Sequence, residues 1–222
     1  MFGRVVARLL LATLILGIGI GAYAYSTGNI ELTFLTRLLE QTASSGAQRA
    51  SLYQRSATDP NAPALEGTAK WQIYSETWVS PETVLRVNVQ IPQRYLSLVM
   101  SMRREPNEIA AMSHLIELRF LRPDQLPFAE ISRIGSIGMS TAEHSRRAVL
   151  MGLPTKVTSG VFLFGLAAGE GEREANVRFL RDLPWMDIPI VYEDGSQASL
   201  AIEKGAAGAR VINQFFSDPG QR

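Results

Sequence analysis

The sequence predicts an α+β domain with a mainly antiparallel sheet and two packed helices, preceded by an N-terminal transmembrane helix. Residues 9–25 carry no charge, which is typical of a membrane or export segment. Much of residues 67–203 alternates apolar with polar side chains, which is typical of strands with one buried face. Hairpin strands followed by a helix, a hairpin and a second helix favour α+β architecture over βαβ repeats.

The N-terminal segment predicts export. Arg4 and Arg8 precede the apolar stretch, and the first charge after it is Glu31. A membrane-spanning helix needs about 20 apolar residues. Residues 5–25 meet this need when Arg8 reaches back to the lipid headgroups. The positive-inside rule then places the N-terminus in the cytoplasm and residues 26–222 outside.

Two further interpretations of this segment remain open. Residues 9–20 form an apolar core that is followed by small residues, which fits a signal peptide cleaved after Ala24. Gly17 and Gly21 have the G-x-x-x-G spacing that lets two membrane helices pack closely, which predicts a homodimer. Anchoring and cleavage exclude each other in the mature protein, but both export the rest of the chain.

Changes in composition predict the domain boundaries. Residues 1–29 are the transmembrane anchor or the cleaved signal peptide, and residues 30–66 are an amphipathic connector and polar linker. The folded periplasmic domain covers residues 67–216, and residues 217–222 are a flexible tail. The linker is rich in small polar residues and has too little apolar content to pack. The folded domain is long enough to bury its own core.

The predicted sheet consists of four alternating segments and two hairpins. These are residues 69–78, 85–91, 95–103 and 114–121, then the hairpins 155–166 and 188–203. The second hairpin has the clearest signal, because Asp194-Gly195 supplies residues that accept the positive φ of a tight turn. His114 lies on an otherwise apolar strand face and is predicted to be a core histidine.

Two segments are predicted to be helical. In residues 170–183 the acidic side chains come early and the arginines come late, which suits the helix dipole, and Pro184 ends the segment. Residues 208–216 offer Phe215, Phe216 and two aliphatic side chains for docking on the sheet.

Composition excludes several classes of function. Residues 67–222 hold 17 basic and 17 acidic side chains, so they lack the positive field that nucleic-acid binding requires. The chain has no cysteine, which excludes disulfides, thiolate catalysis and Cys-ligated zinc. Its two histidines do not have the spacing of a metal motif. We therefore predict no nucleic-acid partner, no metal or cofactor, and no catalytic residue.

One loop is a candidate ligand site. Arg133, Arg146 and Arg147 flank GSIGMS (135–140), and His144 precedes the last two arginines. Glycines near arginines can hold an anion in backbone N–H groups, so these four side chains form the candidate ligand loop. A plain flexible loop is the alternative. A Ser–His–acid hydrolase is recognised by geometry, and adjacency in the sequence does not supply it.

Two stretches carry a family resemblance. LPTKVTSGVFLFGL (153–166) and LPWMDIPIVYEDGSQASLAIEKGAAGAR (183–210) resemble an uncharacterised family of alphaproteobacterial envelope proteins. Members of this family have an N-terminal hydrophobic segment and no assigned activity. The resemblance implies a Gram-negative origin and a periplasmic location, and it supplies no site residue.

Together these features predict a non-enzymatic accessory protein, anchored in the inner membrane, whose periplasmic domain binds another envelope component. One alternative is an envelope hydrolase or an anion- or glycan-binding domain that uses the region from Arg133 to Arg147. Another is a homodimeric structural tether through Gly17 and Gly21. The alternative location is the periplasm itself, after cleavage of the signal peptide.

Overall fold

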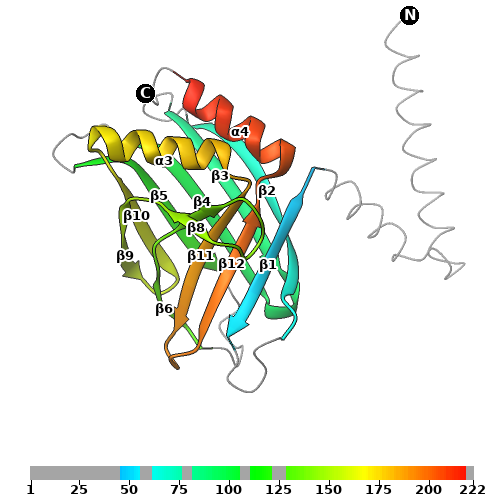
Figure 1. Ribbon diagram of the computed structural model, residues 1–222. Helices are drawn as coiled ribbons and strands as arrows, with labels where there is room; N and C mark the ends of the chain where they lie inside the picture. Colours follow the sequence, from blue (N-terminus) through cyan, green and yellow to red (C-terminus); the bar gives the residue numbers. More distant parts are fainter. Residues whose placement is uncertain (1–45, 56–61, 77–81, 106–110, 122–128, 219–222) are drawn as a thin grey trace, which may run out of the picture. The chain divides into compact units, whose positions relative to one another are not determined.

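Antiparallel strands dominate the computed structural model, which describes residues 46–55, 62–76, 82–105, 111–121 and 129–218 (Figure 1). The first six strands are β1 (Gln48–Arg55), β2 (Leu65–Glu76), β3 (Glu82–Ile91), β4 (Leu96–Arg104), β5 (Met112–Leu121) and β6 (Ile131–Ile134). The next six are β7 (Gly138–Ser140), β8 (Arg147–Val149), β9 (Gly152–Thr158), β10 (Val161–Ala167), β11 (Trp185–Tyr192) and β12 (Gln197–Glu203). The helices are η1 (Pro92–Arg94), which is a 3₁₀ turn, α3 (Glu170–Asp182) and α4 (Gly205–Ser217).

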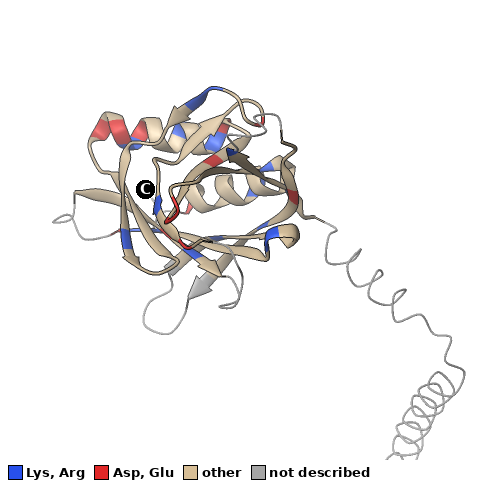
Figure 2. Cartoon of the chain, turned by 90° about the horizontal axis from the view of Figure 1, so that it is seen from below, with Lys and Arg blue, Asp and Glu red and all other residues tan. Residues whose placement is uncertain are grey.

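All twelve strands belong to one sheet, in the order β8-β7-β11-β12-β1-β2-β3-β4-β5-β10-β9, and β6 pairs with β11 beside this path. The sheet curls into a half-barrel, and its wall curves around the interior (Figure 2). The curl brings β6 next to β9, where the Lys156 Nζ donates to the Ile131 carbonyl over 3.1 Å. Ser159 at the end of β9 also donates to the Glu130 carboxylate over 2.8 Å. Side chains therefore bridge this seam.

This architecture corrects the predicted α+β class. Strands account for 58% of the described residues, and the two α-helices of that part are short. The prediction missed β1 and the three short strands β6, β7 and β8, which extend the sheet far enough to curl. Neither described helix has the length and apolar content to span a membrane. The predicted N-terminal transmembrane helix, with Gly17 and Gly21, lies outside the described residues.

The folded unit also begins earlier than predicted. Residues 46–222 form one compact unit, so its boundary lies well before residue 67. Strand β1 falls inside the range predicted to be a linker, and it pairs with β2 on one side and β12 on the other. Its apolar content is low, but Ala50 and Leu52 are both fully buried. The strand is therefore stabilised by two buried side chains and by backbone hydrogen bonds to both neighbours. Its hydropathy alone does not predict it.

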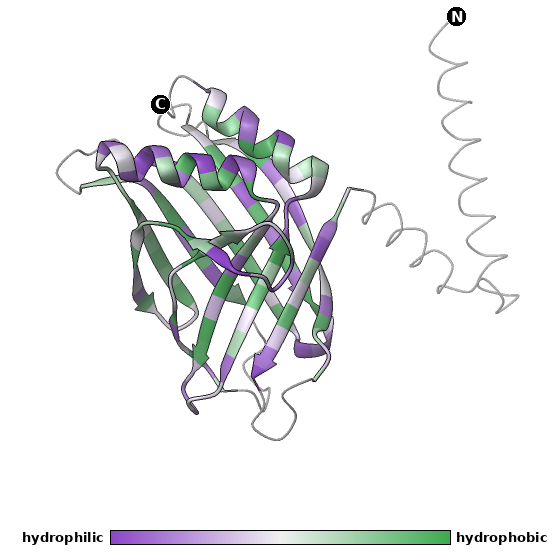
Figure 3. Cartoon of the chain, viewed as in Figure 1, coloured by the Kyte–Doolittle hydropathy of each residue, from purple (hydrophilic) through white to green (hydrophobic). Residues whose placement is uncertain are grey.

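Alternate side chains from the longer strands other than β9 fill one continuous core. The alternation of hydrophobic and hydrophilic residues is visible along the strands in Figure 3. The members of this cluster include Leu85, Val87, Val89, Leu98, Met100, Ile116, Leu118, Phe162, Phe164, Ile188, Ile190, Leu200 and Ile202. His114 follows the same alternation and is 3% exposed, which confirms its prediction as a core histidine.

The two helices lie side by side at one end of the half-barrel (Figure 1). On α4, Ile212, Phe215 and Phe216 enter the core. The helix packs closely on the Trp71 indole because Gly208 has no side chain at the contact. A Cβ at this position would lie only 3.0 Å from the ring. The predicted helix 170–183 is confirmed as α3, and the hairpin at 188–203 is confirmed as β11 and β12.

Asn176 fixes α3 to the segment between β8 and β9. It is fully buried, and its amide oxygen accepts from the Met151 N–H while its amide nitrogen donates to the Met151 carbonyl, both over 2.8 Å. The side chain thus imitates one residue of a neighbouring strand. The contact gives the Met151 N–H its acceptor and adds a second donor to the Met151 carbonyl, which also accepts from the Ala167 N–H over 2.9 Å.

Lys204 joins α3, β12 and α4. Its Nζ donates to the carbonyl oxygens of Leu180 and Arg181 at the end of α3, over 2.6 and 2.8 Å. Its backbone N–H donates to Pro184, and its carbonyl accepts from Gly208 in the first turn of α4. The side chain is 2% exposed, and burial lowers the pKa of Lys204 to about 8. A neutral amine keeps two N–H groups, enough for both carbonyls.

Replacing Lys204 by Met should lower the free energy of unfolding by about 1–3 kcal/mol, because two buried carbonyls lose their donor. Urea denaturation measures this loss. The unfolded chain binds more protons than the native chain between the lowered pKa of about 8 and the ordinary 10.5, so the contribution of Lys204 rises with pH through that window. The difference between wild type and K204M should therefore grow across it. The exposed Lys70 supplies the control, and an equal growth for K70M would contradict the assignment.

Substituting Asn176 by Asp should destabilise the protein by about 2–3 kcal/mol, because a carboxylate cannot donate to the Met151 carbonyl and its charge is buried. Thermal or urea unfolding checks this. The matched control is Asn213, which is exposed on α4, and N213D should stay within about 0.5 kcal/mol of wild type. Equal stability of N176D and wild type would refute the role given to this amide.

Candidate functional site

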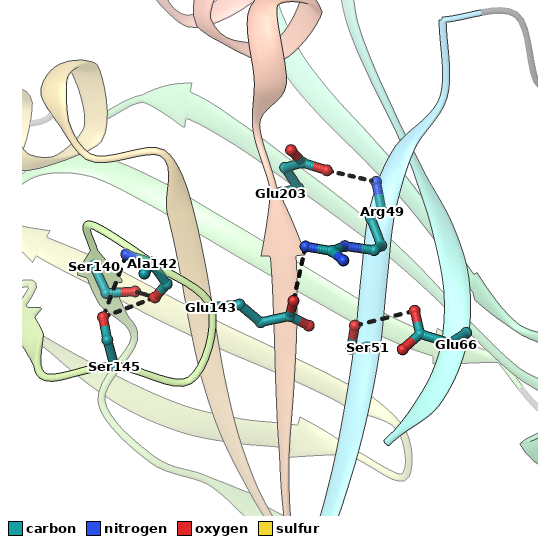
Figure 4. A network of polar contacts seen from close by, with 8 residues as sticks. All are labelled: Arg49, Ser51, Glu66, Ser140, Ala142, Glu143, Ser145 and Glu203. Atoms are coloured by element: carbon teal, nitrogen blue, oxygen red, sulfur yellow. Dashed lines mark hydrogen bonds and ion pairs between the residues drawn. The ribbon is translucent and has the colours of Figure 1, made fainter. Parts of the chain in front are cut away.

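The loop of residues 141–146 folds back over the outer face of β11, β12 and β1 (Figure 4). On this face β1 presents Arg49, Ser51, Tyr53 and Arg55, the side chains that alternate with its core residues. The Glu143 carboxylate of the loop forms an ion pair with Arg49 over 2.9 Å. The His144 ring stacks on Tyr53 with centroids 4.3 Å apart and planes 19° apart. The loop is therefore anchored to β1 by one charge pair and one ring stack.

Short-range hydrogen bonds shape this loop from within. The hydroxyls of Ser140 and Ser145 both donate to the Ala142 carbonyl, over 2.9 and 2.8 Å. The Ser145 oxygen also accepts from the Ala142 N–H over 3.3 Å. His144 adopts a φ of 51°, a left-handed conformation that is uncommon for a residue other than glycine. This turn directs the imidazole toward β1.

Arg49 is the centre of the contact between the loop and the sheet. Besides its pair with Glu143, its guanidinium lies 5.0 Å from the centre of the Trp185 ring on β11. Its backbone N–H donates to the Glu203 carboxylate over 3.2 Å. Nearby, the Ser51 hydroxyl donates to Glu66 over 3.5 Å, and Ser51 is fully buried although it faces outward. The loop thus covers a polar patch of the outer face.

Tyr53 has an altered acidity in this setting. Burial, a hydrogen bond to Glu143 and the negative charge of that carboxylate together raise the pKa of its phenol to about 12, and burial is the largest of these causes. The phenol therefore stays protonated and donates to Glu143. Arg49 opposes the effect, because a positive charge favours the phenolate.

Beside the loop is a pocket of about 510 Å³, here called the arginine pocket. Its charged side chains are Arg55, Arg146, Arg147 and Asp187, and His144 and Ser199 also line it. The Arg147 Nη1 pairs with Asp187 over 2.5 Å, and the Ser199 hydroxyl donates to the other oxygen of that carboxylate. Both carboxylate oxygens therefore already have partners.

The other two arginines have unused capacity. Arg55 donates to the Gln197 side-chain oxygen over 3.1 Å, and no carboxylate of the described part of the chain forms an ion pair with it. Arg146 is exposed, and no carboxylate among the described residues pairs with it. With three arginines against one aspartate, the pocket has a positive balance that suits an anionic group.

The structure brings together three of the four predicted ligand-loop residues. His144, Arg146 and Arg147 line the arginine pocket. Arg133 does not line it, because it lies on β6 opposite Val191. The glycines of the loop also have another role: a Cβ on Gly138 would lie 2.5 Å from the Arg147 Cδ, so this glycine makes room for the arginine stem.

The predicted ligand loop did not include Arg55, Tyr53 and Asp187, which also line the arginine pocket. Arg55 and Tyr53 lie in the range predicted to be a linker, and Asp187 lies on a strand of the predicted hairpin. The alternation of Arg49, Ser51, Tyr53 and Arg55 was the available signal, since polar side chains at every second position indicate one face of a strand. Their meeting with the loop depends on the pairing of β1 with β12 and of β12 with β11.

The residues of a Ser–His–acid site are close in space but are engaged elsewhere. The Ser145 hydroxyl donates to Ala142, and the His144 ring stacks on Tyr53. Asp187 accepts from Arg147 and Ser199. Within the described ranges, no hydrogen bond links these three side chains in the order that a nucleophile requires. The same part of the chain holds no group of three or more side chains that could bind a metal ion.

No protein-family model matches this chain, and neither does any curated protein or solved structure. The resemblance of residues 153–166 and 183–210 to envelope proteins therefore stays a prediction. What the arginine pocket binds has to be argued from its own charge, shape and hydrogen-bonding groups.

The raised pKa of Tyr53 can be measured by ultraviolet titration of wild type against Y53F. The difference signal should titrate near the pKa of about 12 instead of the ordinary 10.0. The native state holds this proton when the unfolded state has lost it, so the contribution of Tyr53 to stability should fall as pH rises through that window. In E143Q the midpoint should move down only in part, because burial is the larger cause. A midpoint near 10 in wild type would contradict the described environment.

Proposed function

We propose that this chain is an exported, non-enzymatic accessory protein of the cell envelope that binds an anionic group of another envelope component in the arginine pocket. The observation that carries the proposal is that Arg55 of β1 lines the same pocket as the adjacent Arg146 and Arg147, with Asp187 as the one acidic side chain among the lining residues. Of the three arginines Asp187 pairs only with Arg147, and no carboxylate among the described residues pairs with Arg55 or Arg146, so these two guanidinium groups can receive a ligand. Guanidinium groups bind carboxylate and phosphate oxygens through two parallel hydrogen bonds, which gives both affinity and orientation.

The construction of the pocket favours recognition of a partner. Its floor is the outer face of β11, β12 and β1, which are held by continuous ladders of backbone hydrogen bonds. Its rim is the loop of residues 141–146, which Glu143 and His144 anchor to β1. Arg55 and Arg147 start from strands of the sheet, and a preorganised backbone lowers the entropy lost on binding. A glycan that carries acidic groups and an acidic segment of a protein both present suitable oxygens.

The location rests on the N-terminal segment. Two arginines before an uncharged stretch favour export of everything after it. The segment serves either as an inner-membrane anchor or as a signal peptide cleaved after Ala24. In both cases the arginine pocket faces the periplasm. The family resemblance supports the same compartment.

The hydrolase alternative has less support, because the residues that it needs are already engaged. Activation of a serine requires a hydrogen bond from its hydroxyl to a neighbouring base. Here Ser145 holds the loop turn and His144 holds the loop to β1. We therefore assign both residues to the construction of the site.

Site-specific photo-cross-linking in cells tests the proposal. A photoreactive amino acid in place of Gln197, which is exposed and lines the arginine pocket, should trap a defined envelope component on the full-length chain. The same group in place of Arg210, on the exposed face of α4, should not trap it. Mass spectrometry of the adduct identifies the partner.

Charge substitutions in the variant that carries the photoreactive group at position 197 show whether the arginines bind the partner. R55Q together with R146Q should lower the adduct yield about tenfold, as expected when charge-assisted hydrogen bonds are lost. R133Q removes an equally exposed arginine outside the pocket and should leave the yield unchanged. The proposal fails if no specific adduct forms, or if R55Q/R146Q and R133Q give the same yield.

A further inference from the structure

A second pocket, here called the helix pocket, opens where α3 and α4 meet the start of β5. Its volume is about 610 Å³, within the range that holds small organic ligands. Its apolar base consists of His114 from β5, Val177 from α3 and Phe216 from α4. None of these residues lines the arginine pocket, so the two pockets are separate.

Aromatic rings form the wall of this base. The His114 ring meets Phe216 edge-on, with centroids 5.4 Å apart and planes 72° apart. It also lies 5.9 Å from the Phe215 ring. Phe215 and Phe216 in turn contact each other at 5.1 Å. A surface of rings and one valine side chain binds hydrocarbon well and offers little to a fully polar ligand.

The rim of the helix pocket is charged, and α3 supplies it. Arg173, Arg178 and Arg181 line the pocket together with Glu174 and Asp182. No ion pair joins any of these five side chains to a described residue. The rim therefore has one positive charge in excess over an apolar base.

Arg181 is the group that points to a ligand. Its guanidinium lies 5.5 Å from the centre of the Phe216 ring, at the border between rim and base. Its Nε is buried and has no hydrogen-bond partner among the described residues. The guanidinium group also has terminal N–H groups, and no ion pair with a described residue engages them. An anionic oxygen bound in the pocket can therefore accept hydrogen bonds from them.

We propose that the helix pocket binds a single-chain amphiphile with an anionic head, of the class of medium-chain carboxylates. The hydrocarbon chain packs on His114, Val177 and Phe216, and the carboxylate accepts hydrogen bonds from Arg181. A small inorganic anion would leave the aromatic base in contact with water, and a neutral alcohol would leave the Arg181 donor poorly satisfied. The inference is independent of the function proposed for the arginine pocket.

Photolabelling of the full-length chain in lipid nanodiscs tests this proposal. A decanoate that carries a diazirine on its chain is the probe, and mass spectrometry of peptides locates the label. The label should concentrate on α3, the start of β5 and the end of α4. Unlabelled decanoate should compete for these peptides, whereas decanol and decyltrimethylammonium should compete weakly. Labels spread evenly over the surface, or equal competition by all three compounds, would overturn the proposal.

Two substitutions examine the chain and the head separately. V177W fills the base and should abolish the labelling of these peptides. R181Q keeps the backbone carbonyl that Lys204 uses and should lower labelling about fivefold to tenfold, as for the loss of one charge-assisted hydrogen bond. R210Q on the exposed face of α4 and R146Q in the arginine pocket should label like wild type. If R181Q also labels like wild type, the assignment of the anionic head is wrong even if V177W fails to fold.

Discussion

The ammonium group of Lys204 is placed where the end of α3, the end of β12 and the start of α4 converge. A helix ends with carbonyls that have no partner within it, and burying them without a donor is costly. Lys204 supplies that donor from another element, so α3 can end inside the molecule. This placement lets both helices cover one end of the half-barrel. The helix pocket lies where α3 and α4 are held together. Arg181 lines the pocket with its side chain, and its backbone carbonyl accepts a hydrogen bond from Lys204.

The strong alternation of the longer strands made much of the sheet predictable. Val87, Val89, Leu98 and Met100 follow a period of two, and they are buried as that period implies. The short strands β6, β7 and β8 have three or four residues each, too few to show any period. Strand β1 has only Ala50 and Leu52 for the core, and its order depends on ladders with strands distant in sequence. The predicted class failed because these weak segments complete the curl of the sheet.

In the candidate sites too, residues that are close in sequence were predictable, whereas residues brought together by strand pairing were not. His144, Arg146 and Arg147 are close in sequence, so their grouping was predictable. Arg55 and Asp187 join them only through the register of β1, β12 and β11, which no local pattern encodes. The helix pocket combines β5, α3 and α4 in the same way. Both pockets lie where elements remote in the chain meet.

The seam between β6 and β9 has a consequence for how this domain survives in a crowded compartment. An exposed strand edge offers unpaired backbone groups to the edges of other chains and promotes aggregation. Here the curl turns the edge of β9 toward β6, and Lys156 spans the gap. Pro154 within β9 removes one backbone donor from that strand. The domain can thus display a large sheet and still resist edge-to-edge association with neighbouring molecules.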